Sequence, residues 1–143
     1  MKKHCVSLEL SRKLKEVGYP QEGEFWWNPG MTNKKIWYEL REDLTSYGSP
    51  QKLPKGIIGI VAPLASELME KLPKDIANKD NDRLVLEIRT YKNRNDEDIY
   101  EPTYYHPHNI ITQTDTNFCN ALARMYIYLA ENKLLEVKNE EEE

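Results

Sequence analysis

The sequence has few cysteines, few glycines and no long apolar segment, and each shortage excludes a class of protein. Two cysteines among 143 residues, Cys5 and Cys119, are too few and too far apart for a secreted disulfide framework. Six glycines, with no Gly-rich phosphate-binding motif, argue against a nucleotide-cradling loop. No run approaches the roughly 20 apolar residues of a membrane span, and none of signal-peptide length follows Met1. We therefore expect a soluble cytoplasmic protein that does not act at a membrane.

The chain also lacks a surplus of basic residues. Its formal net charge is −4, whereas affinity for nucleic acids comes largely from cationic side chains that neutralise phosphates. The balance argues against nucleic acid as the partner. Aromatic residues make up 10% of the chain, too many for a disordered protein. The length suits one domain, so we predict a single domain over 1–135 and a charged, disordered tail over 136–143.

The first helix is predicted from apolar residues spaced three and four apart, which form one buried stripe. These residues are Val6, Leu10, Leu14 and Val17. Ser7 is a suitable N-cap, and Gly18 suits the left-handed position after the last turn. Tyr19-Pro20 then ends the helix, because proline disfavours helical angles in the preceding residue.

Two further helices are predicted. Ala62-Pro63-Leu64 opens the shorter one, with proline in its first turn and Leu68 and Met69 on its apolar stripe. The last helix is predicted over residues 115–132 and carries two adjacent apolar stripes, so we expect it to be covered on more than one side and to be the core element. Its N-cap is predicted among three residues, Thr114, Asp115 and Thr116.

Two hairpins account for the remaining regular structure. Residues 24–27 and 36–40 are short aromatic runs separated by turn formers at 28–33. Residues 84–91 alternate apolar and polar side chains, and 99–105 returns along them.

Pro102 cannot donate a ladder hydrogen bond, so we expect its strand to be broken or at an edge. Residues 41–59 are predicted to be irregular. The predicted fold is α+β, in the order α-β-β-α-β-β-α, with the two hairpins joined into an antiparallel sheet of about four strands under three helices.

Three blocks of the sequence resemble small uncharacterised proteins encoded by bacteriophages and prophages. They are residues 8–21 followed by Phe25-Trp26-Trp27, the block of Ala62-Pro63, Glu67-Leu68 and Leu72-Pro73, and residues 121–135. The chain departs from the family at Lys133, where a glycine is expected after the closing helix. The resemblance implies a phage-derived origin in a bacterial host cell. Since it implies no established activity, it transfers no catalytic residue.

The motif His106-Pro107-His108 is the most suggestive site for a metal ion. Two histidines one residue apart in an extended segment point to the same side, and imidazole is a common metal ligand. A zinc site needs three or four ligands, and the others would come from Cys119, Asp115 or Glu101. The alternative interpretation is a polar turn between the last strand and the last helix. No catalytic residue and no cofactor is predicted. Cys119 is interpreted as a packing residue rather than a nucleophile.

Aromatic side chains are the candidates for an interaction surface, namely Trp26, Trp27, Trp37 and Tyr104. Trp and Tyr are favoured in protein interfaces, but the same residues also suit core packing, or base stacking on single-stranded nucleic acid. The leading hypothesis is a non-enzymatic accessory protein of phage or prophage type that binds a protein partner or forms a homodimer. The alternatives are a metal-binding protein or enzyme centred on His106 and His108, and a single-stranded nucleic-acid accessory protein.

Overall fold

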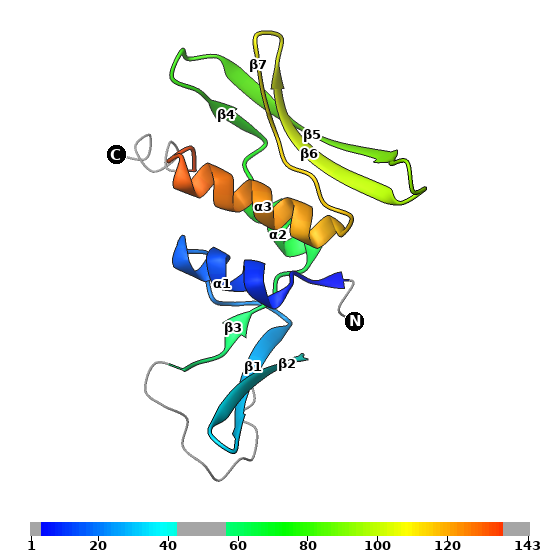
Figure 1. The fold of residues 1–143 in the computed structure, drawn as a ribbon. Coiled ribbons are helices and arrows are strands. Elements are labelled where there is room, and N and C mark those ends of the chain that lie inside the picture. Colours follow the sequence, from blue (N-terminus) through cyan, green and yellow to red (C-terminus); the bar gives the residue numbers. More distant parts are fainter. Residues whose placement is uncertain (1–3, 43–56, 136–143) are drawn as a thin grey trace, which may run out of the picture.

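The computed structural model describes residues 4–42 and 57–135, and these form an α+β protein (Figure 1). The helices in these ranges are α1 (Leu8–Glu16), α2 (Ala65–Lys71) and α3 (Phe118–Glu131). The strands are β1 (Trp26–Thr32), β2 (Lys35–Arg41), β3 (Ile60–Val61), β4 (Asp75–Ala77), β5 (Arg83–Lys92), β6 (Asp98–His106) and β7 (Asn109–Thr112). The predicted class and the order of helices and hairpins are confirmed, and β3, β4 and β7 are additional. Residues 43–56 of the predicted excursion and the tail from 136 lie outside the described ranges.

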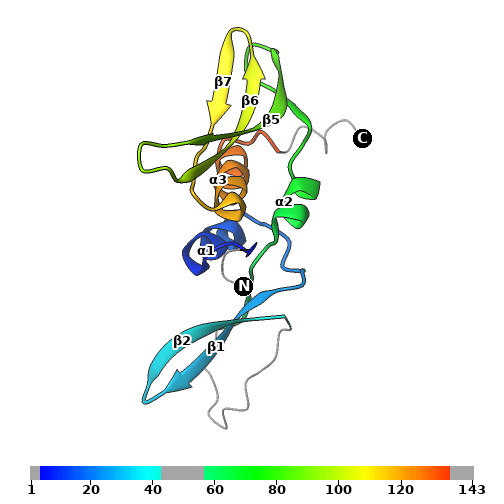
Figure 2. The same cartoon turned by 90° about the vertical axis from the view of Figure 1, so that its right-hand side faces the viewer.

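The strands form two antiparallel sheets rather than the one predicted. One sheet has the order β2-β1-β3 and the other the order β4-β5-β6-β7. The hairpins do not join because short strands occupy the neighbouring positions: β3 pairs with β1, β4 with β5, and β7 with β6. In both views the helices lie between the two sheets (Figures 1 and 2). The β5–β6 hairpin contacts α3, whereas the β1–β2 hairpin is linked to the helices through β3, which contacts α1.

Helix α3 is the core element, as predicted. Its buried side chains come from both predicted stripes, and it contacts α1, α2 and β6. The helix begins later than expected, because Asn117 is its N-cap and accepts a hydrogen bond from the backbone N–H of Asn120 at 3.0 Å. The predicted cap among residues 114–116 is wrong. Asp115 instead accepts the backbone N–H of Asn117 at 2.8 Å, which fixes the chain just before the helix.

Helix α1 has the predicted ends, whereas α2 differs from expectation. Ser7 caps α1, and Gly18 has a φ of 94° just past its end. Pro63 does not lie in the first turn of α2. It precedes the N-cap residue Leu64, and its carbonyl accepts the Val6 N–H at 3.1 Å. Met69 was predicted on the apolar stripe of α2, but it is exposed.

The turn of the first hairpin consists of Asn33 and Lys34 alone, so it begins at the last residue of the longer linker predicted over 28–33. Both residues have positive φ, 51° and 65°, which is the type I′ turn that matches the twist of a two-residue hairpin. Pro29 and Gly30, read from sequence as turn formers, are strand residues and pair with Tyr38 and Trp37.

Pro102 lies in an inner strand, not at an edge. It pairs with Ile88 of β5, while the ladder between β6 and β7 ends one residue away at Thr103 and Thr112. The nitrogen of Pro102 points to the β7 side, as the N–H of Tyr100 does when it donates to Asp115 at 2.9 Å. The missing donor therefore falls where β7 has ended. Within the described ranges, no helix has the length and apolar character needed to cross a membrane.

Candidate functional site

The four-stranded sheet has one face against the helices and one face directed away from them. Side chains alternate along a strand, so Leu84, Leu86 and Tyr104 of β5 and β6 point to the core cluster around α3. The intervening residues point away from it. We call this second side of β4 to β7 the outer face.

A row of apolar side chains crosses the outer face. Val85 pairs with Tyr105, and Tyr105 pairs with Ile110 on the next strand. Their exposed fractions are 52% for Val85, 42% for Tyr105 and 51% for Ile110. Three neighbouring strands thus present apolar groups to solvent at one level of the sheet. We call these three residues the apolar row.

Charged side chains of both signs flank the apolar row. On one side, Arg83 lies 3.4 Å from the carboxylate of Asp75. On the other, Arg89 lies 3.0 Å from the carboxylate of Glu87, and its guanidinium is 5.7 Å from the ring centre of Tyr105. These ion pairs are exposed and contribute little to stability. The outer face therefore combines an apolar centre with charges that compensate each other.

Next to the apolar row, a cross-strand pair of threonines joins β6 and β7 on the outer face. The hydroxyls of Thr103 and Thr112 lie 3.2 Å apart across β6 and β7, and Thr103 is buried. The Thr103 hydroxyl also donates to the carbonyl of Glu101 at 3.3 Å. Cross-strand pairs of this kind stabilise a sheet locally, so the apolar row is presented on an ordered surface.

The structure distributes the four predicted interaction residues over different environments. Tyr104 is completely buried, and its hydroxyl donates to the carbonyl of Pro73. Trp27 is also buried, with its indole N–H donating to the carbonyl of Val6 at 3.1 Å. The prediction of a surface role does not fit Tyr104 or Trp27, because adjacent residues of a strand face opposite sides and these two face the core.

The other two predicted interaction residues are partly accessible. Trp26 is half-buried against the main core, and its indole N–H donates to the carbonyl of Gly23 at 3.1 Å. Trp37 is 38% exposed, and its ring lies over Gly30, where an added Cβ would collide with it. The Trp37 indole N–H donates to the hydroxyl of Thr32 at 3.2 Å. The four residues therefore do not share one surface.

His106 and His108 lie in a tight turn instead of an extended segment. His106 ends β6, and Pro107 and His108 form the two-residue turn into β7, so the turn leads to a strand and not to the last helix. His106 Nδ1 accepts the backbone N–H of His108 at 3.1 Å, and its Nε2 lies 3.8 Å from a carboxylate oxygen of Asp82. The two ring centres are 5.5 Å apart.

This turn geometry leaves few ligands for a metal ion. With Nδ1 of His106 occupied as an acceptor, its Nε2 is the ring nitrogen that carries the proton in the neutral form. Among the residues in 4–42 and 57–135, no three His, Cys, Asp or Glu side chains gather in a way that could hold a metal. Cys119, Asp115 and Glu101 are not brought to the pair as a ligand set.

Both cysteines are buried thiols. Burial raises the pKa of Cys5 to about 11 and also raises the pKa of Cys119 above its ordinary value. The Cys119 thiol donates to the carbonyl of His4 at 2.9 Å. Since the thiolate is the nucleophilic form, these surroundings support the packing interpretation of Cys119.

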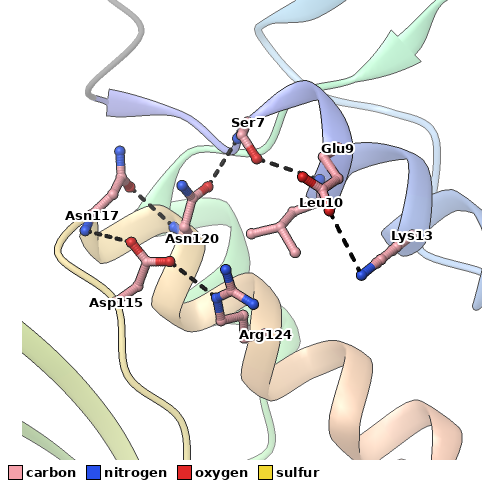
Figure 3. A network of polar contacts seen from close by, with 8 residues as sticks. All are labelled: Ser7, Glu9, Leu10, Lys13, Asp115, Asn117, Asn120 and Arg124. Carbon is pink, nitrogen blue, oxygen red and sulfur yellow. Dashed lines mark hydrogen bonds and ion pairs between the residues drawn. The ribbon is translucent and has the colours of Figure 1, made fainter.

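A polar network at the start of α3 has a structural role (Figure 3). Asp115 accepts a hydrogen bond from the Arg124 guanidinium at 3.0 Å, and Asn120 accepts the backbone N–H of Ser7 at 2.9 Å. Ser7 in turn caps α1. The network therefore ties the beginnings of α1 and α3 together.

The apolar row was not identified from the sequence, although part of its signal is present there. The alternation that places Leu84 and Leu86 inward also places Val85 outward, beside the polar Glu87. Ile110 was missed because β7 was not predicted. In comparisons with known proteins, no family model, no curated sequence and no solved structure matches the chain.

Proposed function

We propose that this chain is a non-enzymatic protein-interaction module of a phage or prophage that acts in the cytoplasm of a bacterial host. The observation that carries the proposal is the outer face, where Val85, Tyr105 and Ile110 are each about half exposed on neighbouring strands. Contiguous apolar patches rimmed by polar residues mark interaction sites. Tyr and Arg are enriched among residues that dominate binding energy, and here Arg89 lies over Tyr105.

The two alternative functions have less support from the geometry. Base stacking needs several accessible rings along one electropositive groove, but Trp27 is buried. The indole N–H groups of Trp26 and Trp37 donate hydrogen bonds to Gly23 and Thr32. A metal centre at His106 and His108 would first have to break the hydrogen bond that His106 accepts within the turn.

The proposal is tested by one substitution in the outer face and one matched substitution elsewhere. Ile110→Glu places a charge in the apolar row, and Ile58→Glu does the same at a residue of similar exposure, 51% against 54%. Tagged protein is used to capture partners from phage-infected host cells, and self-association is measured by light scattering. We expect Ile110→Glu to weaken the affinity for the partner by at least about tenfold and Ile58→Glu to leave it unchanged. Only Ile110→Glu would place a charge inside the surface that becomes buried on binding.

Two results would contradict the proposed function. One is that neither a specific partner nor self-association is detected for the unmodified chain. The other is that Ile110→Glu and Ile58→Glu reduce binding equally, since the outer face would then have no special part in it.

A further inference from the structure

We infer that the outer face packs against the same face of a second copy of this chain, about a twofold axis that runs along the apolar row. The inference rests on the proposed function and names the partner. In such an isologous contact each patch meets its own copy. Val85, Tyr105 and Ile110 would each lie opposite the same residue of the partner.

The charges of β5 fit this symmetry. Arg83 precedes Val85 by two residues and Glu87 follows it by two, so all three side chains point to the outer face. A rotation of 180° about the apolar row exchanges the two flanks. Glu87 therefore comes to lie opposite the partner's Arg83, and Arg83 opposite the partner's Glu87. Two equivalent ion pairs would border the apolar row.

Arg83 and Glu87 can each form a further ion pair in addition to the one within the chain. Arg89 engages one carboxylate oxygen of Glu87 and leaves the other oxygen to accept. The Arg83 side chain is 74% exposed and directs its Nε toward Asp75, while the rest of the guanidinium still offers donors. In a second copy, Arg83 and Glu87 each meet a group of opposite charge. Asp75 pairs with Val85 and so lies on the axis, where its charge is compensated by Arg83 of its own chain.

The geometry also agrees with how sheets pack on each other. Two sheet faces pack about 10 Å apart with their strands aligned to within about 30°. A twofold axis across the strands leaves the strands of the two copies aligned in this way, running in opposite directions. Because the apolar row holds three side chains, the contact falls at the small end of specific interfaces. We therefore expect a reversible dimer rather than an obligate one.

The test is charge reversal on the full chain, measured by sedimentation velocity over a range of concentrations. Arg83→Glu and Glu87→Arg are made separately and together. Each single reversal brings like charges together across the axis and is expected to weaken the dimer by about tenfold or more. The double reversal restores opposite charges and is expected to return the dimer to within about threefold of the unmodified chain. Circular dichroism checks that each variant is folded.

Lys92→Glu is the control, because it reverses an exposed charge on β5 that lies away from the apolar row. It should leave the dimer unchanged. The inference is overturned if the unmodified chain stays monomeric at the highest concentration, if neither single reversal weakens the dimer, or if the double reversal is no stronger than the single ones. If the chain is monomeric while Ile110→Glu loses a different protein partner, the inference fails and the proposed function stands. If substitutions on the outer face change no association of any kind, both fail.

Discussion

The two sheets of this protein differ in how much of the core supports them. The four-stranded sheet lies against the main cluster, to which α1, α2 and α3 all contribute buried side chains. The three-stranded sheet reaches this cluster through Val61 and Trp26. Two other buried residues of this sheet, Trp27 and Ile60, belong to a smaller cluster with Cys5 and Ala62. Since stability follows buried apolar contact, we expect the two regions to resist opening unequally.

The far end of the first hairpin is supported by a contact between its own two strands and by one side chain of α1. Trp37 lies over Gly30 of the paired strand, and Arg12 of α1 lies 4.9 Å from the ring centre of Tyr38. Such contacts are individually worth about 1 kcal/mol or less. The β5–β6 hairpin is thus stabilised by α3 across its face, whereas the far end of the β1–β2 hairpin depends on a few individual side-chain contacts.

The largest effect is expected from removing volume beside α3. Leu122 is completely buried in the main cluster, so Leu122→Ala should lower the free energy of unfolding by about 2–5 kcal/mol. Urea denaturation measures the loss. Glu131→Ala, at an exposed position of the same helix, is the control and should change stability by less than about 0.5 kcal/mol. If the two substitutions lowered the free energy of unfolding equally, the Leu122 side chain of α3 would not be a core residue.

A smaller and local effect is expected in the first hairpin. In Gly30→Ala the new Cβ would collide with the Trp37 ring, at a cost of about 1–3 kcal/mol. Hydrogen exchange should show faster opening of β1 and β2, with little change in α3. Adding Trp37→Ala removes the obstructing ring and should recover part of the loss caused by Gly30→Ala. If exchange in α3 rises as much as in the hairpin, the two regions open together and do not differ in local stability.

The smallest effect concerns the Cys5 thiol, which lies in the smaller hydrophobic cluster. The pKa of Cys5 rises from 9.0 to about 11 in the folded chain, so the unfolded chain ionises first as the pH increases. The stability linked to the neutral thiol is complete below pH 9 and is lost as the pH rises toward 11. Between pH 8 and pH 10 we expect about 1 kcal/mol of loss from this group. Cys5→Ala should have a correspondingly weaker pH dependence in urea denaturation, and an unchanged dependence would refute the assignment.

Elements with a long periodic pattern were predictable from the sequence. The stripes of α1 and α3, the N-cap Ser7, the left-handed Gly18 and the alternation of β5 were all expected and are present. These features depend on residues close together in the chain, whose spacing directly sets which face is apolar.

Short strands, and positions that depend on a distant partner strand, could not be predicted from the sequence. Strands β3, β4 and β7 are two to four residues long, too short for a period to be recognised. Asn117 and Asp115 are both good capping residues, and only the path of the chain determines which one begins α3. Likewise, the outward position of Ile110 depends on a strand that exists because it pairs with β6.

The sequence by itself determined that this is an α+β protein with α3 at its centre, because local spacing of apolar residues decides which segments are amphipathic. The tertiary structure decided that the hairpins belong to separate sheets, since strand pairing depends on partners that are distant in the chain. It also decided that Tyr104 is buried while its neighbour Tyr105 is exposed beside Val85 and Ile110. Which of two adjacent tyrosines meets solvent depends on which face of the sheet the helices cover.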